Sequence, residues 1–281
     1  DVALVCDTSM WDRDTPQITT GLRGMVYEEV TIKAADRDLH SGLFGGAAQN
    51  PIRILARILA DLHDDQGRVT LPGFYEGVPE TPPDILAQWQ GLGLTAENFL
   101  GPIGLSEPSG EKGKLLVEMI QSRPTCDVNG IIGGYTGVGA KTVIAAEASA
   151  KVSFRLVGHQ DPSKIREAFH AHVRERLPKD CTAEFISHKG SPAVTLPFDM
   201  KDLGAARRAL FDEWGVEAVT LGSGGSIPIV GDFKRILGVD TLLVGFGLDD
   251  DRIHSPNEKY DLKSFEKGAR SWARILAALA E

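Results

Sequence analysis

Residues 148–188 read ASAKVSFRLVGHQDPSKIREAFHAHVRERLPKDCTAEFISH, and this stretch decides the fold. Residues 148–157 are rich in β-type side chains and predict a strand. Residues 162–177 begin with proline and carry apolar residues at helical spacing: Ile165, Phe169, Val173 and Leu177. A second strand is predicted over 181–188, so the stretch is a strand, a helix and a strand in succession.

The same kinds of element precede this stretch. Residues 25–34 alternate apolar and polar side chains and predict another strand. Residues 51–63 predict a helix, because Asn50 is a suitable N-cap and Pro51 suits the first helical position. We therefore interpret 25–188 as strand, helix, strand, strand, helix, strand, the order of a split βαβ, ferredoxin-like domain.

Residues 67–122 lie inside this domain and are rich in glycine and proline. They carry only short helical pieces, at 83–90 and 112–121, and predict an elaborated connection rather than a long regular element. The chain is therefore expected to contain an inserted domain at 23–190 with an elaborated segment at 67–122.

The two ends of the chain have a different pattern. Residues 2–6 predict a buried strand, after which 12–21 is rich in turn-forming residues. From residue 201 helices and strands alternate, at 201–214, 218–220, 230–237, 241–245 and 262–279. The closing helix is expected to bury one stripe, formed by Leu262, Phe265, Trp272, Ile275, Leu276 and Leu279. Residues 1–22 and 191–281 are thus predicted to form parts of one α/β domain.

Composition excludes several classes of protein. The chain has 281 residues, with 30 Lys and Arg against 39 Asp and Glu, and a formal net charge of −9. An acidic chain without a long basic run argues against a nucleic-acid partner or an anionic membrane surface. No uncharged apolar stretch reaches the roughly 18 residues that a membrane span requires.

The cysteines indicate a reducing compartment. Cys6, Cys126 and Cys181 are odd in number, far apart and form no CxxC pair, which argues against a disulfide framework or a thiolate zinc site. We therefore expect a cytoplasmic protein. Residue 1 is Asp and opens directly on a strand, so we expect the chain to be the later part of a longer protein.

The glycine-rich stretch 134–142, GYTGVGAKT, only partly resembles a phosphate-binding loop. Such a loop needs Lys directly after its second conserved Gly and a helix beyond it. Here Ala140 intervenes, and the residues that follow Thr142 are strand-like. We interpret the stretch as a flexible loop.

Two other residues could bind a metal ion. Asp7 follows the first predicted strand, and His254 lies just after the predicted strand 241–245. The carboxyl ends of parallel strands meet at one edge of a sheet, so the two side chains could lie together. A carboxylate and an imidazole suit Zn²⁺ or Mn²⁺. The alternatives are a strand-end cap for Asp7 and a hydrogen-bonded surface position for His254.

The chain resembles the di-zinc metallopeptidase and deacylase family of carnosine dipeptidase, aminoacylase, acetylornithine deacetylase and succinyl-diaminopimelate desuccinylase. It is most similar to the carnosinase-like dipeptidase branch. Seven segments carry the resemblance, in order along nearly the whole chain: Val5-Cys-Asp7, Gly21-Leu-Arg-Gly24, Asp38-Leu-His-Ser-Gly42 with Gly45-Gly46, Gly139-Ala-Lys-Thr142, Ser153-Phe-Arg-Leu156, Gly224-Gly-Ser-Ile-Pro228 and His254-Ser-Pro-Asn-Glu258. The resemblance implies part of a zinc-peptidase α/β catalytic domain with an inserted ferredoxin-like α+β dimerisation, or lid, domain.

The resemblance also implies roles for particular residues. Asp7 and His254 would each be a terminal ligand of one of two metal ions, Zn²⁺ or Mn²⁺/Co²⁺, in a complete subunit. His40 would reach the active site of the partner in a homodimer formed through 23–190 and stabilise an oxyanion. Four residues would contact a small peptide or acyl-amino-acid substrate: Thr142, Arg155, Ser226 and, more weakly matched, Asn129. From the residues alone, His40 also fits a structural turn, and Arg155 also fits the polar face of a strand.

The sequence departs from the family in two places. Gly222-Ser223 stand where many relatives carry an Arg-Glu pair, which puts substrate contacts there in doubt. The family's His-x-Asp segment, bridging Asp and catalytic Glu-Glu pair lie upstream of the strand that ends at Asp7. The 281 residues alone are therefore expected to be inactive, although the complete protein would hydrolyse a peptide or amide bond. The alternative is a non-catalytic dimerising or substrate-binding scaffold. Cys126 and the histidines His63, His159, His170, His172 and His188 are interpreted as structural or surface residues.

Overall fold

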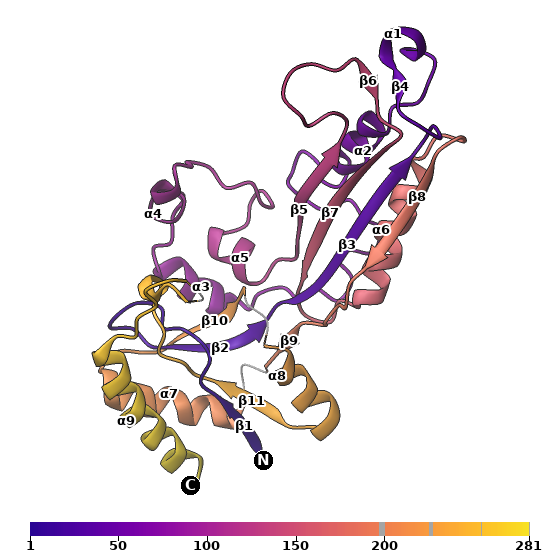
Figure 1. The fold of residues 1–281 in the computed structure, drawn as a ribbon. Coiled ribbons are helices and arrows are strands. Elements are labelled where there is room, and N and C mark those ends of the chain that lie inside the picture. Colours follow the sequence, from indigo (N-terminus) through magenta and orange to yellow (C-terminus); the bar gives the residue numbers. More distant parts are fainter. Residues whose placement is uncertain (197–199, 225–226, 254, 281) are drawn as a thin grey trace. The chain divides into compact units, whose positions relative to one another are not determined.

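The computed structural model describes residues 1–196, 200–224, 227–253 and 255–280, and divides the chain into two compact units (Figure 1). The first unit consists of 1–23, 81–93 and 193–281, and the second of 24–80 and 94–192. No helix among the described residues is long and apolar enough to cross a membrane.

The second unit contains a four-stranded antiparallel sheet. Its strands in spatial order are β5 (Thr125–Gly133), β7 (Glu147–Leu156), β3 (Gly24–Lys33) and β8 (Thr182–Ser187). With the helices α2 (Pro51–Ala60) and α6 (Pro162–Glu175), this is the predicted ferredoxin-like order. The sequence pattern predicted no residues for the second strand of this order, which in the structure is β5. Three of its apolar side chains are exposed and a bulge interrupts its register, so it lacks a clear alternation.

Alternation along the central strands builds the core of this unit. Val26, Val30 and Ile32 of β3 are fully buried, as are Val152 and the other inward residues of β7. Leu55 of α2 and Phe169 of α6 pack into the same cluster. Both helices begin where the sequence predicts, with the side chains of Asn50 and Asp161 accepting hydrogen bonds from first-turn amides.

The first unit contains a mixed sheet formed by both ends of the chain. Its order is β1 (Val2–Val5), β11 (Asp240–Leu243), β2 (Gln17–Leu22) and β10 (Val219–Ser223), with β9 (Val194–Thr195) also paired to β2. β1 and β11 are parallel neighbours, which confirms that both ends of the chain share a sheet. β2 was not predicted, because nearly all of it lies within 12–21, a stretch that is rich in turn-forming residues.

The closing helix α9 (Leu262–Leu279) buries only part of the predicted stripe. Ile275 is buried, and Trp272 and Leu279 are partly buried against the core of the first unit. The fully buried positions of the helix are the small residues Ser264, Gly268 and Ser271, together with Ile275. Leu262 and Phe265 are 78% and 63% exposed. Small side chains let the helix approach α7 (Lys201–Trp214) and Phe246 closely, and the Trp214 indole N–H donates a 3.0 Å hydrogen bond to Ser271 Oγ.

The segment 67–122 is divided between the units. Helix α3 (Pro83–Gly91) belongs to the first unit, where the Trp89 indole N–H donates to the Thr220 carbonyl at 2.9 Å. The expected inserted domain had included this helix. The remaining short elements of the chain are β4 (Leu39–His40), α1 (Ser41–Phe44), α4 (Ala96–Phe99), η1 (Gly101–Ile103), α5 (Leu116–Gln121), β6 (Val143–Ile144), α8 (Pro228–Asp232), η2 (Phe233–Leu237) and η3 (Asp249–Asp251).

Candidate active site

His40 and Thr142 lie next to each other at one end of the second unit. His40 ends β4 and is paired with Val143 of β6, and the amide of Ser41 donates a 3.0 Å hydrogen bond to the Thr142 carbonyl. Both residues are exposed. Figure 1 shows β4, α1 and β6 together beyond one end of the four-stranded sheet. The structure thus brings together two of the predicted site residues.

The His40 imidazole has a defined orientation. Its Nδ1 accepts a 2.9 Å hydrogen bond from the Gly42 amide. A backbone N–H only donates, so Nδ1 must carry a lone pair, and the neutral ring then carries its proton on Nε2. The ring therefore offers an N–H donor on the side away from the backbone.

The loop before Thr142 does not form a phosphate-binding site. Thr142 leads directly into strand β6 rather than into a helix, as the sequence predicts. The Tyr135 hydroxyl donates to the Val138 carbonyl at 3.0 Å, and Lys141 Nζ lies 5.7 Å from the Tyr135 ring centroid. The loop is folded back on itself by these contacts.

Arg155 lies at the opposite end of the same sheet. It occupies β7 opposite Met25 of β3 and Thr125 of β5, whereas Ala148, at the other end of β7, lies opposite Ile32. The seven residue steps from Ala148 to Arg155 span about 23 Å at about 3.3 Å per step. One chain therefore does not bring Arg155 together with His40 and Thr142.

Arg155 and Asn129 are both available for binding. Arg155 is half-buried on the face of β7 opposite Phe154, and no carboxylate among the described residues pairs with it. Asn129 lies at the bulge of β5, where two residues oppose one, and is exposed. The site roles of these residues stay predictions.

Asp7 lies where the sequence places it, at the carboxyl end of β1. Val244 donates its amide to the Val5 carbonyl at 3.1 Å, and Met10 donates to Gly247 at 2.9 Å, so the residues after β1 run beside those after β11. A Cβ at Gly245 would lie 1.9 Å from the Thr8 carbonyl oxygen, which shows how closely the segments approach. Ser226 and His254 lie outside the described residues.

The loop around η3 is tied to the segment after β1 by ion pairs. Arg13 contacts Asp250 at 3.1 Å and Asp261 at 3.3 Å, and Lys263 pairs with Asp14. Buried Asp251 accepts the Leu248 amide at 2.8 Å and pairs with Lys259 at 2.6 Å. These contacts join residues 248–251 to Lys259, and Asp250, Asp261 and Lys263 to the segment after β1.

Asp7 has the chemistry of a metal ligand, and its role as one stays a prediction. Its carboxylate is exposed and makes no ion pair with any residue that the structure describes. Within the same residues, no three His, Cys, Asp or Glu side chains gather to hold an ion. A carboxylate at the end of a strand is a suitable oxygen ligand for Zn²⁺ or Mn²⁺.

The adjacent glutamates of β3 do not form a catalytic pair. Glu28 is fully buried beneath α6, where it accepts hydrogen bonds from Arg166 Nε at 2.6 Å and His170 Nε2 at 2.7 Å. The Ser187 hydroxyl donates to the same carboxylate at 2.8 Å. Glu28 is therefore a structural anion of the core, and His170 is one of its partners.

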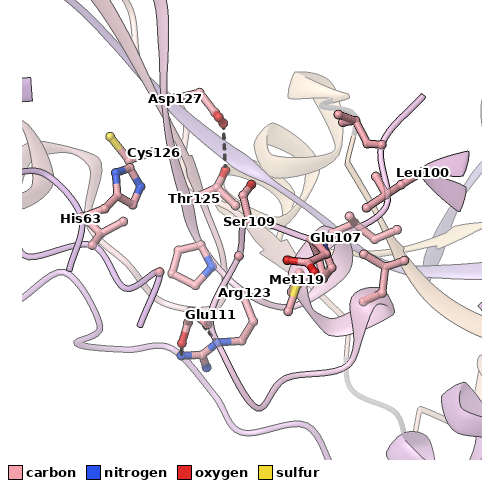
Figure 2. A pocket seen from close by; sticks show the side chains of 18 of the residues that line it. His63, Leu100, Glu107, Ser109, Glu111, Met119, Arg123, Thr125, Cys126 and Asp127 are labelled. Atoms are coloured by element: carbon pink, nitrogen blue, oxygen red, sulfur yellow. Dashed lines mark hydrogen bonds and ion pairs between the residues drawn. The ribbon is translucent and has the colours of Figure 1, made fainter. Parts of the chain in front are cut away.

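A cavity of about 240 Å³ in the second unit holds none of the predicted site residues (Figure 2). It lies between the strand β5 and the segment around α5, with apolar walls that include Leu100 and Met119. Arg123 donates two 2.9 Å hydrogen bonds to Glu111 beside it. Burial raises the pKa of the Cys126 thiol, which agrees with a structural role for that cysteine.

Comparison with known proteins identifies the family. The profile described as peptidase dimerisation domain matches residues 20–181. The Cys-Gly metallodipeptidase DUG1 of Candida albicans is 31% identical over 96% of this chain and 56% of its own length. The Beta-Ala-His dipeptidase of Homo sapiens is 27% identical over 99% of this chain and 56% of its own.

Solved structures agree with this match. The di-peptidase Dug1p from Saccharomyces cerevisiae has a TM-score of 0.80 at 27% identity, covering 99% of this chain and 59% of that one. The M20 family metallo-carboxypeptidase from Sulfolobus solfataricus has a TM-score of 0.83 at 27% identity, covering 98% and 62%. The chain thus spans about three fifths of the length of these relatives. It belongs to the M20 peptidase family and contains the family's dimerisation domain.

Proposed function

We propose that the chain is part of a metal-dependent hydrolase that cleaves the peptide or amide bond of a dipeptide or an N-acyl amino acid. Relatives that match nearly the whole chain are named as Cys-Gly and Beta-Ala-His dipeptidases, which favours a dipeptide. These enzyme names favour a hydrolase over the scaffold alternative. The three cysteines are free, which fits a cytoplasmic setting.

Asp7 and His254 would each hold one of two divalent metal ions, Zn²⁺ or Mn²⁺/Co²⁺. When bound, such ions polarise the scissile carbonyl and activate a water molecule. The exposed, unpaired Asp7 carboxylate at the end of β1 supports its assignment as a ligand. The remaining ligands and the general base would come from the part of the catalytic domain that these 281 residues do not contain.

Four residues would position the substrate. The Arg155 guanidinium, free of any ion pair with the described residues, would hold a terminal carboxylate through two parallel hydrogen bonds. Ser226 and Asn129 would add polar contacts to the substrate, and Thr142 would add another from the loop beside His40. His40 would donate its Nε2–H to the negative charge that develops on the carbonyl oxygen.

The separation of His40 from Arg155 carries the case for an active homodimer. Because Arg155 and the His40–Thr142 pair lie at opposite ends of one sheet, a single chain does not close a site around one dipeptide. In a twofold dimer, His40 and Thr142 of one subunit would complete the site of the other.

An edge of the sheet in the second unit suits such a dimer. β5 is an edge strand, and its side chains Val128, Ile131 and Ile132 are exposed. Ile52 on the neighbouring helix α2 is also exposed and lies against Gly133 and Gly134. An open apolar strand edge readily pairs with another chain, so we place the dimer contact at β5 and α2.

The activity is tested on the polypeptide that carries the complete M20 catalytic domain. Purified protein is assayed against a panel of dipeptides and N-acyl amino acids, before and after chelation and re-addition of Zn²⁺, Mn²⁺ or Co²⁺. We expect dipeptide hydrolysis that chelation abolishes and a metal restores. Asp7→Ala should lower the metal content per subunit. Full activity in chelator, or no hydrolysis of any panel member with metal present, would overturn the proposal.

A further inference from the structure

Gly42 packs closely against the His40 ring, in the place that a side chain would otherwise occupy. A Cβ on Gly42 would lie 2.9 Å from Cε1 and 3.2 Å from Nδ1 of the imidazole. Carbon atoms that are not bonded normally stay at least about 3.5 Å apart, so a methyl group would displace the ring. The backbone at Gly42 is not left-handed, so its conformation alone would permit other residues. The glycine therefore serves the close approach of the ring.

The backbone around His40 is held independently of the ring. Gly45 donates its amide to the Ser41 carbonyl at 2.8 Å and closes the turn. Ser41 in turn donates to Thr142, and Asp38 accepts the Ala146 amide at 2.9 Å. One hydrogen bond thus closes the turn and two tie it to the residues that flank β6, so the Gly42 amide is already in place for Nδ1.

We propose that Gly42 is a positioning residue for His40. Its N–H holds the imidazole in the form protonated at Nε2, and its missing side chain leaves room for the ring to receive that hydrogen bond. Within the described part of the chain, no other group hydrogen-bonds the His40 side chain. Among the described residues, the Gly42 amide is therefore the one hydrogen-bond partner that determines which nitrogen of the His40 ring donates outward.

The consequence for catalysis rests on the proposed function of His40. An outward donor of fixed orientation costs little reorganisation when charge develops on the substrate oxygen. A ring free to rotate or to exchange its proton between nitrogens would spend part of its time with a lone pair facing the substrate. Gly42 would thus act through His40 on the rate of the chemical step rather than on substrate affinity.

A spectroscopic test needs only the 281-residue chain. In ¹⁵N-labelled protein, an N–H···N hydrogen bond gives a scalar coupling between the Gly42 amide nitrogen and His40 Nδ1. We expect this coupling in the wild type and its loss in Gly42→Ala, with the ring nitrogen shifts moving toward the average of two tautomers. Gly101→Ala is the matched control, because a Cβ there meets no atom within 4 Å and its φ is not positive. No coupling in the wild type, or a coupling that survives Gly42→Ala, would overturn the proposal.

A kinetic test in the complete enzyme separates Gly42 from His40. We expect Gly42→Ala to lower kcat about tenfold to a hundredfold with little change in KM, and Gly101→Ala to change neither. His40→Asn is measured beside them. If His40→Asn lowers kcat and Gly42→Ala does not, the positioning role is wrong. If His40→Asn itself leaves kcat unchanged, the proposed function of His40 fails instead.

Discussion

Arg155 and His40 lie at opposite ends of one antiparallel sheet, with Arg155 opposite the first residues of β3 and His40 beyond its last. The distance between them along the strands far exceeds the length of a dipeptide. If both residues bind the same substrate, they must come from different subunits. The proposed roles of His40 and Arg155 therefore require that the enzyme be a homodimer.

Arg155→Ala is expected to weaken substrate binding through the loss of two charge-assisted hydrogen bonds. In the complete enzyme, KM for a dipeptide with a free carboxylate should rise by about 10- to 100-fold. The same dipeptide with an amidated C-terminus should lose little, because it offers no carboxylate. Lys151→Ala, an exposed change on the same strand, is the control. Equal losses for both substrates would contradict the assigned role.

Glu28→Gln is expected to destabilise the second unit by about 3 kcal/mol. The substitution removes the buried negative charge with which Arg166 and His170 pair. It leaves the partly buried Arg166 guanidinium without its ionic partner. Urea unfolding of the chain measures the change. Glu29→Gln, on the solvent side of the same strand, should change the unfolding midpoint much less, because solvent screens its ion pairs. Similar urea midpoints for the two variants would show that the cluster around Glu28 does not stabilise the folded chain.

The contact between α7 and α9 is expected to depend on pH through Glu213. Burial opposes ionisation of this carboxyl, but hydrogen bonds from Arg270 and Arg274 outweigh it and hold the pKa below the usual range. A lowered pKa in the folded state stabilises the protein above the unfolded value of about 4.5, and this stabilisation is lost as pH falls through the folded pKa. Glu213→Gln should therefore be less stable than the wild type at pH 7. In thermal unfolding, the difference should shrink as the pH falls below about 4.5 and through the lowered pKa of Glu213; a constant difference would contradict the linkage.

Gly268→Ala tests which face of α9 is buried. In an exposed helix, replacing glycine by alanine stabilises by up to about 1 kcal/mol. Here the new Cβ would lie 2.7 Å from the Phe246 ring, so we expect a loss of about 1–3 kcal/mol. Phe265→Ser, on the exposed face, should change the free energy of unfolding of the chain by less than about 0.5 kcal/mol. A larger loss for Phe265→Ser than for Gly268→Ala would show that the apolar stripe is the buried face.

The sequence predicted best the elements whose patterns report burial directly. β3 and α6 have regular alternation or helical periodicity, and their positions agree with the structure to within two residues. β5 was missed because an edge strand with exposed isoleucines and a bulge has no such pattern. The buried face of α9 was predicted only in part, because Ser264, Gly268 and Ser271 are buried beside Ile275 and a hydrophobic stripe does not show small residues that pack closely.

The site was predicted mainly through resemblance. Asp7 at a strand end was visible in the sequence, but the pairing of His40 with β6 depends on residues about a hundred positions apart. Nothing in the spacing indicated that the Gly42 amide donates to His40 Nδ1. The hydrogen bond between Gly42 and His40 depends on the conformation of the turn, which the sequence does not show.

Mixed dimers test the central claim most directly. Differently tagged His40→Asn and Arg155→Ala forms of the complete enzyme are prepared separately, and each homodimer is expected to have little activity at a substrate concentration near the wild-type KM. After mixing, unfolding and refolding together, heterodimers contain one site with both wild-type residues if the site spans two subunits. Purified heterodimers should then recover about half of the wild-type kcat per dimer, with a wild-type KM. Heterodimers as inactive as either parent would show that each subunit uses its own His40 and Arg155, and would contradict the shared site.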